Sequence, residues 1–170
     1  SSLDKMLIFK VNLKKIFVNF TIVLSIFLID RFSKIFILKI AELENKVDIY
    51  LTPNLNIYLI WNKGIAFGLL SFNTSFIYNI ITLIIISITL VVLAWTVRAK
   101  GLKRYSLLLV LGGSLGNLFD RIYYNAVPDF IDFHINDFHW FVFNVADIFI
   151  TIGIICLVFK EIFFDNEKNA

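Results

Sequence analysis

The chain has 170 residues, of which 59% are hydrophobic, 16% aromatic and only 17% charged. That apolar content exceeds the roughly half found in ordinary soluble domains, and it predicts an integral membrane protein. The formal net charge of +3 would suit a nucleic-acid binder, but the basic residues cluster beside apolar runs, so we expect no nucleic-acid partner. Neither a linker nor a Gly/Ser-rich stretch divides the sequence, which favours one domain over residues 1–170.

Four apolar segments approach the length of a membrane span, about 20 helical residues for a hydrocarbon core about 30 Å thick. They are residues 16–38, 76–97, 105–122 and 141–164, and they predict an all-α membrane bundle of four transmembrane helices. Glycines interrupt the third segment. The first could be a secretory signal peptide, but it is too long and lacks a small-x-small cleavage site, so we interpret it as a permanent helix.

The basic residues predict the orientation of these spans. Lys14 and Lys15 precede the first span, residues 98–104 hold four Lys and Arg between the second and third, and Lys160 lies in the last. Residues 123–140 hold none. Because cytoplasmic flanks are rich in Lys and Arg, we expect both termini to be cytoplasmic and both longer connections to face outward.

The two outward connections differ in pattern. Residues 47–61 alternate apolar and polar around a Pro-Asn turn, which predicts a hairpin or small sheet within a β element over about 45–72. Residues 123–140 are aromatic, and DFHIN followed by DFHWF forms a near-repeat. We interpret that connection as an interfacial helix or a lid with its rings at headgroup depth.

Charged residues inside the first span suggest a polar site. Asp30 and Lys34 are four residues apart and share a helix face. They could form a self-neutralising ion pair with Lys34 snorkelling to the surface. Alternatively they brace a polar site from the side, since ionisable residues inside a membrane are functional candidates by default.

The third span ends in GGSLGNLFDR. Gly112 and Gly116 form a small-xxx-small pair that lets another helix approach closely. Asn117, Asp120 and Arg121 follow at the outer boundary. Because Asp120 and Arg121 are adjacent, they cannot face each other, and each needs a partner elsewhere.

Two acids, Asp129 in VPDFIDF and Asp147 in FNVAD, flank the start of the last span. Asn144 with Asp147 resembles a helix N-cap with an acid in the first turn, but a cap does not explain the second acid. We expect the two carboxylates to meet. Two carboxylates about 3 Å apart share one proton and titrate as a unit, and such a pair can activate a water and protonate a leaving amine.

Other chemistries have weaker support. His134 and His139 with Asp132 and Asp137 could suggest a metal site, but their spacing is poor and no HExxH motif is present. The single cysteine, Cys156, excludes an intramolecular disulfide and a thiolate cluster. No GxSxG, P-loop or GxGxxG motif occurs. We therefore expect neither a metal nor a cofactor.

Five ordered motifs, DRFSK, NKGIAF, GGSLGNLFDR, VPDFIDF and FNVAD, carry a resemblance. In this order and spacing the chain resembles, over nearly its whole length, bacterial lipoprotein signal peptidases, also called signal peptidase II. The resemblance implies an aspartic endopeptidase of the cytoplasmic (inner) membrane that cleaves prolipoproteins just before a diacylglyceryl-modified cysteine. It also implies four transmembrane helices, a small extracytoplasmic β-sheet, a short extracytoplasmic helix and an active site near the outer face.

The resemblance assigns roles residue by residue. The catalytic pair falls on Asp129 and Asp147. The implied partners are prolipoproteins bearing diacylglyceryl-cysteine, membrane lipid and globomycin-type inhibitors, and we expect a monomer. The motif departs from the family only locally, with Pro128 at an often aliphatic position and Arg31 where Gln is frequent. The implied substrate-groove residues are Asn62, Gly64, Asn117, Arg121 (a donor to the substrate backbone) and Asn144, and the implied supporting residues are Asp30, Lys34 and Asp120.

Two other classes remain open from the residues alone. A small multi-pass transporter would place acids near the midplane within repeated spans, whereas here the acids gather at one boundary. A non-enzymatic membrane assembly subunit would tolerate loss of both acids. An intramembrane aspartyl protease of the presenilin or prepilin type would want a GxGD motif, which is absent from the sequence.

Overall fold

The computed structural model describes residues 2–64, 74–136 and 138–165. Four helices and four strands follow one another along the chain. They are α1 (Ser2–Glu44), β1 (Asp48–Thr52), β2 (Leu55–Asn62), α2 (Thr74–Arg98), α3 (Gly101–Tyr124), β3 (Val127–Ile135), β4 (Phe138–Phe143) and α4 (Val145–Lys160), with a π-helical turn (Glu161–Asp165) extending α4.

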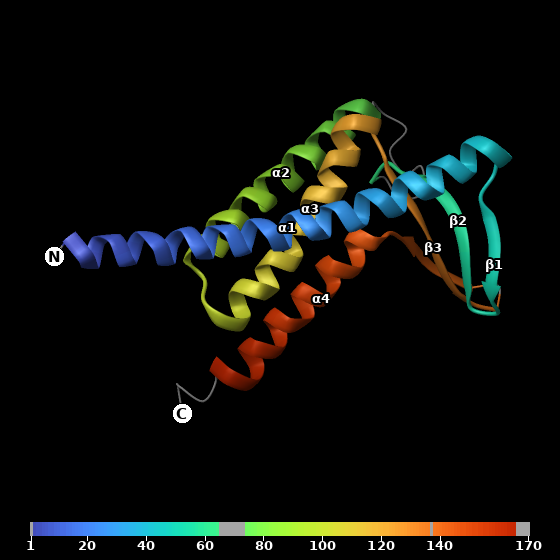
Figure 1. The fold of residues 1–170 in the computed structure, drawn as a ribbon. Coiled ribbons are helices and arrows are strands. Elements are labelled where there is room, and N and C mark those ends of the chain that lie inside the picture. The colour runs from blue at the N-terminus through green and yellow to red at the C-terminus, as the bar shows by residue number, and fades with distance from the viewer. Residues whose placement is uncertain (1, 65–73, 137, 166–170) are drawn as a thin grey trace.

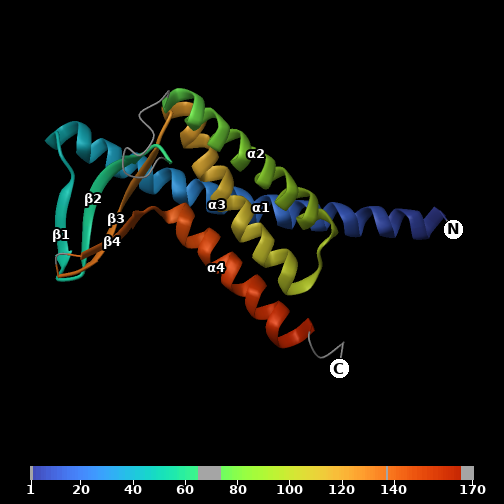
Figure 2. The same ribbon diagram turned by 180° about the vertical axis from the view of Figure 1, so that it is seen from behind.

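Helix α3 occupies the middle of the helical part and contacts α1, α2 and α4. The sheet lies at one end, beside the last turns of α1, and β3 and β4 lead from α3 into α4 (Figure 1). The start of α1 and the end of α4 both lie away from the sheet, as the reverse view also shows (Figure 2). Polar residues near the sheet end of α1, α3 and α4 are therefore brought together.

The sheet is antiparallel with its strands in sequence order. The hairpin predicted for residues 47–61 is confirmed by the pairing of β1 with β2 around the turn at 53–54. The predicted β element extended to residue 72, and its last part, with Phe67, lies outside the described residues. Ile37, Val47 and Phe130 form a buried cluster that attaches the sheet to α1.

Of the two interpretations of residues 123–140, the interfacial helix is wrong, and the lid stays a prediction. The near-repeat is a hairpin, because β3 and β4 pair with His134 opposite His139. Aromatic and β-branched side chains favour strands, and β2 offers an edge on which β3 pairs. The same pairing explains why α4 begins at Val145 and not at 141, since residues 138–143 belong to a strand.

Apolar side chains cover much of the outside of the helices, while several charged groups are buried. Phe17 is 70% exposed and Val91 63% exposed, whereas Asp30 and Lys34 are fully buried. Among the described residues, one helix, Ser75–Arg98, combines the length and hydropathy of a membrane span. The other helices carry charges or, in α4, are 16 residues long, so four transmembrane helices stay a prediction.

Candidate active site

Asp129 lies on β3 with its carboxylate between two asparagine amides. Asn62 Nδ2 donates to Asp129 Oδ2 (2.9 Å), and Asn144 Nδ2 donates to Asp129 Oδ1 (2.7 Å). Asn62 is the last residue of β2 and is paired with Val127 of β3. Because residues two apart on a strand share a face, this register puts the Asn62 amide beside the carboxylate. Asp129 is only 2% exposed.

Asp147 lies in the first turn of α4 and forms a capping box with Asn144. The Asn144 side chain accepts from the Asp147 backbone N–H (3.1 Å), and Asp147 Oδ2 accepts from the Asn144 backbone N–H (3.0 Å). The predicted cap is therefore confirmed. The other oxygen, Asp147 Oδ1, accepts from Asn117 Nδ2 of α3 (2.8 Å). Asp147 is half-buried.

The two acids meet at Asn144. Its side-chain nitrogen binds Asp129 while its backbone N–H binds Asp147. No direct hydrogen bond joins the two carboxylates among the bonds of the described residues, so a shared proton stays a prediction. Because both carboxylates bind Asn144, the side chains of Asp129 and Asp147 lie on the same side of the bundle.

Obligate donors fix the orientation of the amides around the acids. Asn117 Oδ1 accepts from Lys34 Nζ and from Asn144 Nδ2 (3.0 Å each), so Asn117 must turn its own nitrogen to Asp147. Asn144 Oδ1 accepts from a backbone N–H, so its nitrogen must face Asp129. Lysine and backbone N–H groups cannot accept. The amides that donate to the two acids therefore cannot exchange the positions of their nitrogen and oxygen.

Burial raises the pKa of Asp129 from 3.8 to about 6, because the charged carboxylate loses its hydration. The hydrogen bonds from Asn62 and Asn144 lower this pKa, the nearby charge of Asp147 raises it, and that of Lys34 lowers it. Desolvation is the largest of these effects. Asp129 is thus a carboxyl group that can exchange a proton near neutral pH.

A buried ion cluster supports the acids from the side of α1. Lys34 Nζ contacts Asp30 Oδ2 (2.8 Å) and Asp120 Oδ2 (2.6 Å), and Arg31 Nη1 contacts Asp120 Oδ1 (2.5 Å). The predicted pair of Asp30 and Lys34 is confirmed, but the snorkelling of Lys34 is wrong, because three acceptors, including Asn117, hold its ammonium in the interior.

Asp30 also fixes the start of α4. Asp30 Oδ1 accepts from the Ala146 backbone N–H (2.9 Å), one of the first N–H groups of α4, which have no partner within the helix. Gly116 makes room for this carboxylate, since a Cβ there would lie 2.5 Å from Asp30 Oδ2. A Cβ at Gly112 would lie 2.8 Å from Ile26. The predicted close packing at both glycines is confirmed.

Arg121 and Gly64 lie at the edge of the same network. Gly64 donates its backbone N–H to Asn62 Oδ1 (2.7 Å), and a Cβ on Gly64 would approach Arg121 Nη1 to 3.2 Å. Gly64 has a φ of +73°, which side chains disfavour. The guanidinium carbon of Arg121 lies 5.9 Å from the centre of the Tyr78 ring, and the Tyr78 hydroxyl donates to the Arg121 carbonyl (2.9 Å). Arg121 Nη1 is buried and has no partner among the described residues.

Nine of the ten residues named as site or supporting candidates are joined by hydrogen bonds or ion pairs, and the tenth, Arg121, lies beside Gly64; their roles stay predictions. Three contributors were not anticipated: Arg31 as the partner of Asp120, the Ala146 backbone N–H, and Tyr78. The adjacency of Asp120 and Arg121 signalled that each needed another partner, but it could not say which. A small cavity of about 220 Å³ is lined in part by Asn117 and Arg121 and reaches α2 and α4.

The histidine alternative gains little. His134 Nδ1 lies 3.5 Å from Asp132 Oδ2, while Asp137 lies outside the described residues. Among the described residues no group of three or more His, Cys, Asp or Glu side chains could hold a metal ion.

Two solved structures share this fold. Both are described as bacterial membrane enzymes: one superposes with a TM-score of 0.70 and 27% identity over 86% of this chain and 94% of its own, and the other with 0.65 and 29% over 85% and 87%. The fold is that of a membrane enzyme.

Sequence comparison specifies the family. The profile described as "Signal peptidase (SPase) II" matches residues 22–163. A protein from Pelagibacter ubique named "Lipoprotein signal peptidase" is 55% identical over 94% of this chain and 96% of its own. One of the same name from Anaplasma phagocytophilum is 32% identical over 93% and 100%. The chain belongs to the signal peptidase II family and is a protease.

Proposed function

We propose that the chain is an aspartic endopeptidase that removes signal peptides from prolipoproteins, cutting just before a cysteine that carries diacylglycerol. Family membership and the names of the relatives support the substrate class. The observation that carries the mechanism is the convergence of Asp129 and Asp147 on Asn144.

In this mechanism Asp147 is the ionised acid and Asp129 carries the proton. Asp147 accepts from a backbone N–H at a helix N-terminus, where partial positive charge favours an anion, and from an amide that Lys34 polarises. Within the described part of the chain, Asp129 accepts from side-chain amides alone, and it is almost fully buried. Burial raises the pKa of Asp129 to about 6, so this acid holds a proton more readily than an ordinary carboxyl group does.

The reaction then needs no metal or covalent intermediate. A water between the acids gives a proton to Asp147 as its oxygen attacks the scissile carbonyl carbon. Asp129 donates its proton toward the carbonyl oxygen and stabilises the developing oxyanion. On collapse, the C–N bond breaks, the amine takes a proton from Asp147, and Asp129 recovers its own.

Groups beside the acids supply donors for the substrate. Arg121 Nη1 has no partner among the described residues, so it is suited to a backbone carbonyl of the signal peptide. Asn117 is half-buried and has one amide hydrogen not used in the bonds above. Asn144 differs, because its side chain is fully buried and all its donors and acceptors are used. It positions the acids and does not line the groove.

The proposed setting is the bacterial inner membrane. Four helices cross it, both termini are cytoplasmic, and the acids lie near the outer face beside the sheet. The exposed apolar surfaces of the helices support this placement. The start of α1 and the end of α4 also lie at the same end of the molecule, away from the sheet (Figure 1). The substrate enters sideways with its acyl chains in lipid, the enzyme acts as a monomer, and globomycin occupies the active site.

The test is cleavage of a diacylglyceryl-modified prolipoprotein by the full chain, with and without globomycin. Asp129→Asn and Asp147→Asn should each lower turnover about a hundredfold or more, the usual contribution of a general acid or base, while folding and substrate binding persist. Asp48→Asn is the control, because Asp48 is exposed and lies on β1. Substantial turnover by either active-site variant would refute the acid pair and favour an assembly role.

A further inference from the structure

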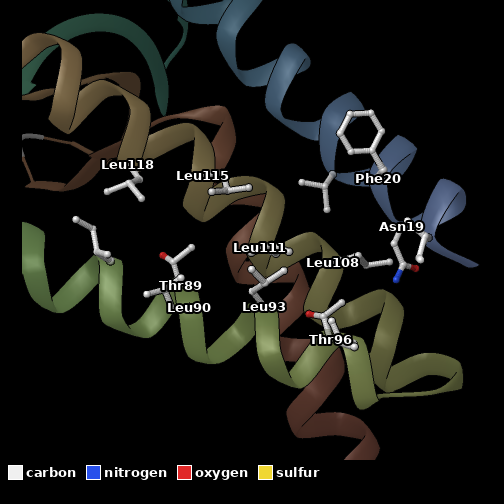
Figure 3. A pocket seen from close by; sticks show the side chains of 14 residues that line it. Asn19, Phe20, Thr89, Leu90, Leu93, Thr96, Leu108, Leu111, Leu115 and Leu118 are labelled. Atoms are coloured by element: carbon white, nitrogen blue, oxygen red, sulfur yellow. The ribbon is translucent and has the colours of Figure 1, made fainter.

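An apolar groove lies between α1, α2 and α3, on a part of the molecule that the proposed chemistry does not use. One hollow of about 450 Å³ is lined by residues of these three helices, whose side chains point into one space (Figure 3). A second hollow of about 370 Å³ shares Phe20, Val23, Leu115 and Leu118 with the first. The two hollows therefore form one continuous groove.

The groove is long enough to hold a lipid chain of one leaflet and is open to its surroundings. Along α3 its lining runs from Leu108 to Ile122, about 21 Å at 1.5 Å per residue. One leaflet of the hydrocarbon core is about 15 Å thick, half of about 30 Å. Phe20 and Leu90, which line it, are 63% and 59% exposed. In a membrane enzyme, an open apolar groove of this length is filled by hydrocarbon.

One end of the groove carries concentrated positive charge. Lys15 Nζ donates to the Val97 carbonyl at 3.0 Å, and Val97 and Ile16 line the groove there. Arg98 follows directly and is exposed. No acid occurs in residues 12–29 or 95–106, and Glu161 and Asp165 belong to the end of α4, which does not line the groove.

At the other end, the charged side chain that contacts the groove lining is neutralised, and Arg121 lines the separate cavity between α2, α3 and α4. Arg31 lies there with its guanidinium over the Phe119 ring (4.8 Å), but Asp120 neutralises it in the buried ion cluster. Because basic residues near a membrane surface attract anionic groups, an anionic ligand would lie with its charged group at the Lys15 end.

Asn19 adds a polar group at the depth where a lipid becomes polar. It follows Lys15 by one helical turn and lines the groove among apolar side chains (Figure 3). Its Oδ1 is buried and has no partner among the described residues. Since a carboxamide can present either its oxygen or its nitrogen after rotation, this position can bind a hydroxyl or an ester carbonyl.

We infer that this groove binds one molecule of an anionic membrane phospholipid, with an acyl chain along α3 and its phosphate at Lys15 and Arg98. Asn19 binds the glycerol ester region. The site is separate from the acids, which lie where α3 and α4 meet the sheet. The inference rests on the membrane placement and not on the peptidase chemistry, so failure of one leaves the other standing.

Native mass spectrometry of the detergent-solubilised full chain tests the head group. With equal concentrations of phosphatidylglycerol and phosphatidylcholine, the chain should retain one phosphatidylglycerol with a preference of roughly tenfold or more, as expected for two cations near a phosphate. Lys15→Gln combined with Arg98→Gln should abolish the preference. Lys39→Gln, on the exposed far end of α1, should keep it, and inorganic phosphate should not displace the lipid.

A second pair of variants tests the groove itself. Val23→Trp fills the part shared by both hollows and should remove the bound phosphatidylglycerol, whereas Val91→Trp on the exposed face of α2 should not. Equal retention of the two lipids by the unmodified chain, or retention of the preference after both cations are removed, overturns the inference. If Val23→Trp does not fold, the head-group comparison decides alone.

Discussion

Replacing Lys34 by Met should destabilise the protein and misplace its acids at the same time. The ammonium is fully buried and contacts Asp30, Asp120 and the Asn117 carbonyl at 2.6–3.0 Å. Its removal leaves the Asp30 carboxylate without its cation, while Asp120 keeps Arg31. It also weakens the hold on the Asn117 amide, whose carbonyl loses the bond from Lys34 and keeps the one from Asn144.

The size of the effect follows from these contacts. Breaking a buried ion pair by removing one partner costs about 3–5 kcal/mol, because the remaining charge is buried and uncompensated. Methionine keeps most of the volume of lysine, so little of the loss comes from a cavity. Weakening the bond from Asn117 to Asp147 lowers turnover by up to about tenfold, the equivalent of a hydrogen bond of about 1.4 kcal/mol.

A double variant separates stability from positioning. Lys34→Met with Asp30→Asn removes the carboxylate left unpaired and keeps the pair of Arg31 with Asp120, so it should regain part of the unfolding free energy. Turnover should stay low because the Asn117 carbonyl has lost the bond from Lys34 and keeps the one from Asn144. The measurements are unfolding in mixed micelles and cleavage of a diacylglyceryl-modified prolipoprotein per folded molecule. Lys39→Met, on the same helix but exposed, is the control. A Lys34→Met protein within about 1 kcal/mol of the parent would contradict the measured penalties for buried charges, and a double variant with full turnover would remove the positioning role.

Three further predictions test the surroundings of the acids. Burial raises the pKa of Asp129 from 3.8 to about 6, so the protonated group stabilises the fold below pH 4. This stabilisation is lost as the pH rises to 6, by about 3 kcal/mol at 1.36 kcal/mol per pH unit. In Asp129→Asn, the unfolding free energy measured from pH 4 to 7 should lack this decrease. Asn62→Ala removes a bond that lowers the same pKa, so the alkaline limb of the activity profile should move to higher pH, and a shift to lower pH would contradict the assignment. Gly116→Ala should cost about 1–3 kcal/mol of unfolding free energy by overpacking and reduce turnover, since its Cβ would lie 2.5 Å from the Asp30 carboxylate; unchanged turnover would show that Asp30 does not position α4.

The sequence predicts the helical segments and the first hairpin because their signals are local. Apolar runs and period-two alternation depend only on neighbouring residues. The helix predicted for residues 123–140 is wrong because strand β3 forms by pairing with β2, which is far away in sequence. Aromatic rings suit a membrane interface and a strand equally well, so composition alone cannot separate the two.

The candidate site could be predicted as a set of residues but not as a network. Ion pairing of Asp30 with Lys34 follows from helical spacing, whereas the contact of Lys34 with Asn117 depends on how α1 packs against α3. That packing is permitted by Gly112 and Gly116. The partner of Asp120 was undetermined for the same reason, since Arg31 lies on a different helix.

The capping of α4 and the proposed chemistry use the same atoms of Asn144, so we expect that another capping residue cannot replace it. A serine at this position could accept from the Asp147 N–H and preserve the helix start. It has no second donor to reach both Asp129 and Asn117, as the Asn144 nitrogen does. Asn144→Ser should therefore keep most of the unfolding free energy while turnover falls, and Asn144→Ala should lose both, with about 1 kcal/mol attributable to the cap. Equal turnover in the serine variant and the parent would mean that the cap alone matters, and that the acids do not depend on Asn144 for their placement.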